Sequence, residues 1–242
     1  MSTSQSPPSG RHRFAPLRAQ SQPSDGTIQL QGIIFDMDGT LCEPQNYMFG
    51  EMRKALGIPK STDIIDHINS LPSEEQPAAW TKIEDIERTA MVKQVAQPGL
   101  TQLLEYLDQK NIRKGICTRN FDKPVNHLLA NHVAGHIIPF QPVLTRSFKP
   151  PKPSPAGILH IVQNWGVRTP AEPSEKQQIP VIMVGDSIDD IVAGHDAGAL
   201  TVLLASPGKE DLAEDARTDV VVDRLDELVE LLEHGLNSRH AS

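Results

Sequence analysis

The sequence has 242 residues, of which 38% are hydrophobic, and it carries a formal net charge of −8. This length suits one large domain or a core domain with a small insert. The acidic balance argues against a general nucleic-acid binder, which would need a basic face. No apolar stretch approaches the ~20 residues that a membrane-spanning helix needs. The composition therefore favours a globular protein with neither nucleic acid nor membrane as its partner.

The two cysteines, Cys42 and Cys117, are too few for a zinc cluster or a disulfide framework. They predict reduced thiols, and with them a cytoplasmic protein. Residues 1–29 are rich in Ser, Pro, Gln and Arg, which is typical of a disordered tail. A mitochondrial transit peptide is the alternative, but four prolines in this segment would break an amphipathic helix. Residues 237–242 are predicted to form a second tail.

The first predicted element is a buried strand at residues 30–35. Three helical stretches follow, within an insert that we place at residues 45–96. Their apolar residues recur at helical spacing, and we expect Ser61 or Thr62 to cap the second of them. The three stretches are expected at residues 44–57, 61–71 and 73–95.

Strands and amphipathic helices then alternate from Pro98 onward. The expected strands are residues 112–117, 137–144, 181–184, 200–205 and 220–222. The expected helices are residues 100–109, 124–132, 154–165, 189–197 and a last one ending near residue 234. Residues 168–180 are expected to form a solvent-exposed loop. This alternation predicts an α/β fold, a Rossmann-like three-layer parallel sheet with a small helical cap inserted after the first strand. The core domain would comprise residues 30–44 and 97–236.

Polar residues follow three of the predicted strands at the point where each strand ends. Asp36 and Asp38 lie two apart after the first strand, so their side chains would point the same way in an extended chain. A plain turn is the alternative, because Asp and Gly often end strands. Thr118 and Asp186 end two later strands. In parallel α/β sheets ligands bind at the carboxyl ends of strands, so we expect these residues to share a site.

Hard oxygen ligands without a thiolate or imidazole suit Mg²⁺, which favours carboxylates, water and phosphate. Asp36 and Asp186 are such candidates. Asp190 lies one helical turn after Asp186 and would bind the ion directly or through water, or else cap the helix. Asp189 is expected to point elsewhere, as an exposed acid in the first helical turn.

Four segments in this order resemble the haloacid dehalogenase-like hydrolase superfamily: residues 33–41, 116–120, 152–155 and 181–190. The resemblance covers residues 30–234 and is to the phosphatase type with a small helical cap. It implies a Mg²⁺-dependent phosphatase that acts on a small phosphorylated metabolite through an aspartyl-phosphate. The alternatives are a phosphomutase of the same superfamily and a non-catalytic binding or regulatory protein on this fold.

The resemblance also implies a role for each motif residue. Asp36 would be the nucleophile and a metal ligand. Asp38 would be the general acid and base, with its backbone carbonyl on the metal, and Asp186 and Asp190 would complete the metal site. Haloacid dehalogenases themselves lack a carboxylate at the position of Asp38, because a halide needs no proton on leaving. Asp38 therefore points to phosphate esters.

The phosphate group needs hydrogen-bond donors and positive charge. Thr118 and the amides after it would supply neutral donors, and Lys152 would supply charge, with Lys149 as a competitor. A plain surface lysine is the alternative for Lys152. Arg119 and Asn120 would bind the substrate phosphate or cap the next helix. The sequence does not identify the substrate, the cap residues that contact it or the oligomeric state.

Overall fold

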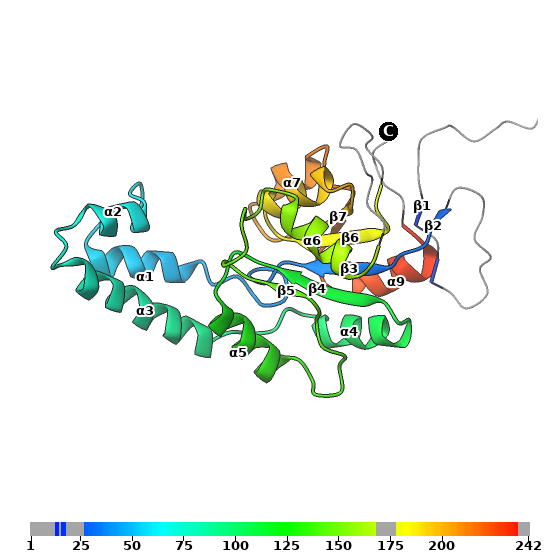
Figure 1. The fold of residues 1–242 in the computed structure, drawn as a ribbon, viewed down its shortest axis with the longest axis horizontal. Helices are drawn as coiled ribbons and strands as arrows, with labels where there is room; N and C mark the ends of the chain where they lie inside the picture. Colours follow the sequence, from blue (N-terminus) through cyan, green and yellow to red (C-terminus); the bar gives the residue numbers. More distant parts are fainter. Residues whose placement is uncertain (1–12, 15, 18–26, 168–177, 237–242) are drawn as a thin grey trace, which may run out of the picture.

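A six-stranded parallel sheet forms the centre of the protein, with strands in the order β5-β4-β3-β6-β7-β8 (Figure 1). The computed structural model describes residues 13–14, 16–17, 27–167 and 178–236. The strands are β3 (Gly32–Phe35), β4 (Arg113–Cys117), β5 (Val143–Leu144), β6 (Val181–Gly185), β7 (Leu200–Leu204) and β8 (Val220–Val222). β3 lies between β4 and β6 and carries the first motif at its carboxyl end. The predicted α/β class and parallel sheet are confirmed.

Helices cover both faces of the sheet. Successive residues of a strand face opposite sides, so apolar strands present side chains to the helices on each face. Ile33 and Phe35 pack in one hydrophobic cluster with helices α4, α5 and α9. Ile34 packs in a second cluster with α6 and α7. The helices are α4 (Leu100–Gln109), α5 (Asp122–His132), α6 (Ala156–Asn164), α7 (Ile188–Asp196), α8 (Glu210–Glu214) and α9 (Glu227–His234). The short helix α8 is absent from the sequence-based prediction.

Three helices between β3 and α4 pack around a small hydrophobic cluster of their own, to one side of the sheet (Figure 1). They are α1 (Tyr47–Leu56), α2 (Ile64–Ser70) and α3 (Gln76–Val92). Asp63 caps α2 by accepting hydrogen bonds from the Ile65 and Asp66 amides, so the expectation of a Ser61 or Thr62 cap is wrong. Within the described chain, no helix combines the length and apolarity needed to cross a membrane.

Part of the N-terminal segment packs against the core. Phe14 is only 2% exposed, and its amide donates to the Leu236 carbonyl at 2.6 Å. Strand β1 (Arg13–Phe14) pairs in parallel with β2 (Thr27–Ile28). The expectation of a tail over residues 1–29 is therefore wrong for these residues. The rest of that segment, the expected tail at 237–242 and most of the expected loop at 168–180 lie outside the described residues.

Phe14→Ala should lower the free energy of unfolding by about 3 kcal/mol, because it removes a buried ring that packs in the larger hydrophobic cluster. The matched control is Phe49→Ala, since Phe49 in α1 is 47% exposed and its truncation should cost much less. Urea unfolding of both variants makes the comparison. Equal, small effects would mean that the N-terminal segment adds nothing to the fold.

Candidate active site

A tight turn after β3 brings the first motif against Asp186. The Asp36 amide donates to the Val184 carbonyl at 2.9 Å, and the Leu41 amide closes the turn on the Met37 carbonyl at 2.8 Å. Gly39 has φ +81°, and a Cβ there would lie 2.2 Å from Asp186 Oδ2. Glycine is needed here for both the backbone angle and the close approach.

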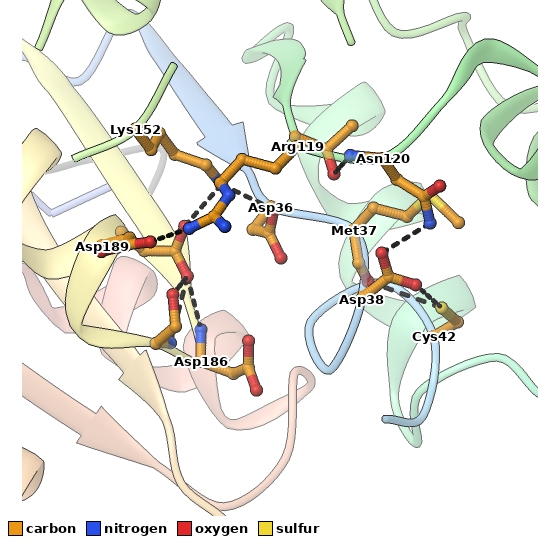
Figure 2. A network of polar contacts seen from close by, with 12 residues as sticks. Asp36, Met37, Asp38, Cys42, Arg119, Asn120, Lys152, Asp186 and Asp189 are labelled. Atoms are coloured by element: carbon orange, nitrogen blue, oxygen red, sulfur yellow. Dashed lines mark hydrogen bonds and ion pairs between the residues drawn. The ribbon is translucent and has the colours of Figure 1, made fainter. Parts of the chain in front are cut away.

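Lys152 joins two buried carboxylates at the centre of the site. Its Nζ donates to Asp36 Oδ1 at 2.6 Å and to Asp190 Oδ1 at 2.5 Å, and all three residues are buried (Figure 2). Lys149, its competitor in the sequence, is exposed. Burial lowers the pKa of Lys152, but the charges of Asp190 and Asp36 outweigh it and raise the pKa above its usual range. Lys152 therefore stays charged at neutral pH.

Burial also sets the protonation of Asp36. It raises the pKa of this carboxyl to about 7, against the opposing effect of Lys152 and with a smaller contribution from the Asp190 charge. Desolvation disfavours the charged form of a carboxyl group, which accounts for the direction. In the absence of a further cation, Asp36 is therefore close to half protonated at neutral pH.

Asp36, Asp186 and Asp190 each place a carboxylate oxygen within 4.8 Å of the others. Asp186 forms an ion pair with Lys209, whose Nζ also donates to the Asp186 backbone carbonyl. Burial raises the pKa of Asp186, and the Lys209 hydrogen bond lowers it. The three carboxylates thus meet in one small volume, as expected for Asp36 and Asp186 at neighbouring strand ends and for Asp190 one helical turn after Asp186.

Asp190 has a second set of partners at the start of α7. Its Oδ2 accepts from the Ser187 hydroxyl at 2.6 Å and from the Ser187 amide at 3.0 Å, completing a capping box. The helix-capping alternative for Asp190 is therefore observed. Because Oδ1 accepts from Lys152, both oxygens already have protein donors.

Asp38 lies beside Asn120 rather than Lys152. Asn120 Nδ2 donates to Asp38 Oδ2 at 2.7 Å, and the Asn120 amide donates to Thr118 Oγ1 at 3.1 Å (Figure 2). Burial raises the pKa of Asp38, and the Asn120 hydrogen bond partly opposes that rise. Asn120 therefore holds Asp38 in place, a role that the sequence analysis did not consider.

Arg119 forms an ion pair with Asp189, which comes from the first turn of α7. Asp189 is half-buried, so the expectation of an exposed acid is wrong. Its carboxylate pairs with Arg119 and is not one of the three that meet within 4.8 Å, in agreement with the expectation that it points elsewhere. Lys209, which pairs with Asp186, was not expected from the sequence. Its position five residues after β7, near the end of another parallel strand, is the signal that would have found it.

The cysteines are both free and buried. Burial raises the pKa of the Cys117 thiol to about 11, and that of Cys42 above its usual range. The thiolate is the reactive form of cysteine, so both thiols are inert at neutral pH.

The fold and the carboxylate centre define an α/β protein with its site at the carboxyl ends of parallel strands. The haloacid dehalogenase-like hydrolase model matches residues 30–198. An uncharacterized hydrolase from Saccharomyces cerevisiae is 40% identical over 217 residues, which cover 88% of this chain and 95% of the relative. N-acetylmuramic acid 6-phosphate phosphatase from Pseudomonas aeruginosa is 25% identical over 233 residues, covering 86% and 97% respectively.

A solved structure of a HAD hydrolase of family IA, variant 3, from Entamoeba histolytica has the same fold. Its TM-score is 0.63 at 20% identity, over 84% of this chain and 100% of that one. The chain belongs to the haloacid dehalogenase-like hydrolase family and is an enzyme of that class. The resemblance drawn from the four motifs is confirmed.

The metal-free protein should lose stability as the pH rises through 7. Folded Asp36 keeps a proton up to about pH 7, whereas in the unfolded chain it releases the proton near its ordinary pKa of 3.8. We expect the free energy of unfolding to fall by about 1.4 kcal/mol between pH 6 and pH 8 from this group. Urea unfolding in the presence of a chelator measures it.

The control for this measurement is Asp36→Asn, which cannot titrate and should show a shallower pH dependence. The raised pKa values of Asp38 and Asp186 act in the same direction and leave a residual slope. If the variant kept the full slope, the burial of Asp36 would not be its source.

Proposed function

We propose that this enzyme is a Mg²⁺-dependent phosphatase that hydrolyses a small phosphomonoester through a phosphorylated Asp36. The observation that carries the proposal is the arrangement at the end of β3. Asp36 accepts a hydrogen bond from the buried Lys152, and its carboxylate lies within 4.8 Å of that of Asp186. Asp38, two residues later in the chain, instead accepts a hydrogen bond from Asn120. Two carboxylates from one strand end thus have different surroundings, which is how one site performs both nucleophilic and acid-base chemistry.

The donor set fits a hard divalent cation. Asp36, Asp186 and Asp190 offer carboxylate oxygens within 4.8 Å of one another, with no soft ligand among them. Such a set suits Mg²⁺, which takes one or two carboxylates and keeps several waters. Asp36, Asp186 and the Asp38 backbone carbonyl would hold the ion directly. Because both oxygens of Asp190 already accept hydrogen bonds, we assign it contact through water and the orientation of Lys152.

When bound, Mg²⁺ would favour the ionised form of Asp36 and polarise the phosphoryl oxygens. The Asp36 carboxylate then attacks phosphorus, forming an aspartyl-phosphate while the ester P–O bond breaks. Asp38, whose pKa is raised mainly by burial in the direction that favours the protonated form, would give its proton to the leaving alcohol oxygen. A water molecule next attacks phosphorus and loses a proton to Asp38. The acyl-phosphate P–O bond breaks, releasing inorganic phosphate and the Asp36 carboxylate.

Charge and hydrogen bonds would hold the phosphoryl group during both steps. Lys152 supplies a fixed positive charge beside Asp36. Thr118 lies at the end of β4, next to β3, and its hydroxyl and the Arg119 amide would supply neutral donors, whereas the Asn120 amide already donates to Thr118 Oγ1. Asn120, also assigned to phosphate by the sequence, is better placed to orient Asp38. The named activity of the Pseudomonas aeruginosa relative, a sugar-phosphate phosphatase, supports hydrolysis of a small phosphorylated metabolite.

Asp36→Asn should abolish release of phosphate from p-nitrophenyl phosphate in the presence of Mg²⁺, because the amide cannot form the covalent intermediate. Asp38→Asn should lower kcat/KM by about a hundred- to ten-thousand-fold on an alkyl phosphate, which needs a proton on its leaving oxygen. The loss should be smaller on the aryl ester, whose leaving group is already stable as an anion. Steady-state kinetics on the two esters checks both expectations.

Near-normal turnover by Asp36→Asn would exclude the covalent mechanism. An equal loss of kcat/KM on both esters would exclude Asp38 as the proton donor, because kcat/KM does not include the later hydrolysis step in which Asp38 acts on both. A phosphomutase would instead exchange phosphate between sugar phosphates with little free phosphate, and a binding protein would show no turnover with or without Mg²⁺.

Lys209→Met should tighten Mg²⁺ binding by about tenfold, because Lys209 neutralises Asp186 and competes with a cation for that carboxylate. Isothermal titration calorimetry of the chelator-treated protein measures the affinity without any turnover. Lys149→Met is the matched control, since Lys149 is exposed and should leave the affinity unchanged. Weaker binding by Lys209→Met would mean that Lys209 instead holds Asp186 in the geometry that the ion requires.

A further inference from the structure

The ion pair between Arg119 and Asp189 joins residues on either side of β3, the strand that carries the proposed nucleophile at its carboxyl end. Arg119 follows β4, Asp189 lies just after β6, and β3 with Asp36 at its end runs between those two strands. Figure 2 shows the Arg119 side chain reaching from the end of β4 to Asp189 on the side of Lys152 and Asp36. A phosphoryl group bound at Asp36 would lie at the carboxyl end of β3, and the two members of this pair follow the strands on either side of it.

Stability does not account for this ion pair. The Arg119 side chain is 60% exposed, and exposed ion pairs contribute only about 0–1 kcal/mol because water screens them and ordering a long side chain costs entropy. Asp189 adds a further negative charge beside Asp36, Asp186 and Asp190. An anionic substrate would be repelled by such a charge unless a cation accompanied it.

Arg119 differs from the other two cations at the strand ends. Lys152 is buried and committed to Asp36 and Asp190, and Lys209 is committed to Asp186. Arg119 contacts Asp189 through one nitrogen, Nη1, and the structure gives its other guanidinium nitrogens no hydrogen-bond partner among the described residues. A guanidinium has five N–H donors in a fixed plane, a geometry that matches phosphate oxygens. The remaining donors are thus available to a substrate.

We propose that Arg119 binds the phosphoryl oxygens of the substrate, and that Asp189 is the positioning residue that holds the guanidinium across the end of β3. The inference rests on the proposed phosphatase function and adds Asp189 to its machinery. Asp189 would act through Arg119 alone and would not contact the substrate. Fixing the arginine in advance lowers the entropy that substrate binding must overcome.

The test is a double-mutant cycle with Arg119→Gln, Asp189→Asn and the double variant. Equilibrium binding of inorganic phosphate to the Mg²⁺-loaded protein, measured by calorimetry, is the first readout, and KM and kcat for p-nitrophenyl phosphate are the second. Arg119→Gln should weaken phosphate binding by about tenfold, the loss of one charge-assisted interaction. Asp189→Asn should weaken it about threefold in the wild-type background and not at all when residue 119 is glutamine.

The matched control is Asp66→Asn, which removes an exposed acid from the first turn of a helix in the cap, away from the sheet (Figure 1). It should leave phosphate binding unchanged. A fully additive cycle would overturn the proposal, and so would tighter phosphate binding by Asp189→Asn, because Asp189 would then act only by repulsion. Unchanged phosphate binding by Arg119→Gln would overturn it as well.

The two readouts separate this inference from the proposed function. If the wild-type protein bound phosphate with the expected coupling but hydrolysed no ester, the phosphatase proposal would fail and the Arg119–Asp189 assignment would stand. If hydrolysis occurred without the coupling, the phosphatase would stand and the assignment would fail.

Discussion

The buried contact between Lys152 and two carboxylates is the interaction on which the rest of the site depends. Asp36 comes from the end of β3 and Asp190 from the first turn of α7, and their charges would repel each other in a region with little water. Removing one partner of such a buried charged group leaves an uncompensated charge, which costs several kcal/mol. The lysine therefore fixes the distance between the end of β3 and the start of α7. Asp186 and the turn at Gly39 are positioned by the same two elements.

The sequence predicted which residues converge at one edge of the sheet better than it predicted their hydrogen-bond partners. Strand ends in a parallel sheet converge, so Asp36, Thr118 and Asp186 were correctly expected at one edge. Which side chain faces which depends on rotamers and on the exact approach of distant loops. Neither periodicity nor spacing encodes that information. The pairing of Lys209 with Asp186, and of Asn120 with Asp38, therefore needed the structure.

The same limit explains the errors at the N-terminus and at α2. A single buried ring, Phe14, ties a polar and proline-rich segment to the core, and composition averaged over 29 residues hides it. The helix α2 is capped by Asp63 rather than by Ser61 or Thr62, because several residues in a row are suitable caps and the sequence alone does not say which one is used. Elements with strong apolar patterns, such as β3 and β6, can be recognised from their own residues, and their positions were predicted well.

The charge balance at the strand ends determines which ligands the site favours. Five carboxylates gather there, from Asp36, Asp38, Asp186, Asp189 and Asp190, against three cations, from Lys152, Lys209 and Arg119. Without a metal, burial first and the neighbouring negative charges second raise the pKa values of Asp36, Asp38 and Asp186, and those charges disfavour an anionic substrate. A divalent cation would remove that excess and leave Arg119, the exposed cation of the three, to meet the phosphate. Binding of the ion and of the substrate would then be linked: each would favour the other through the same carboxylates.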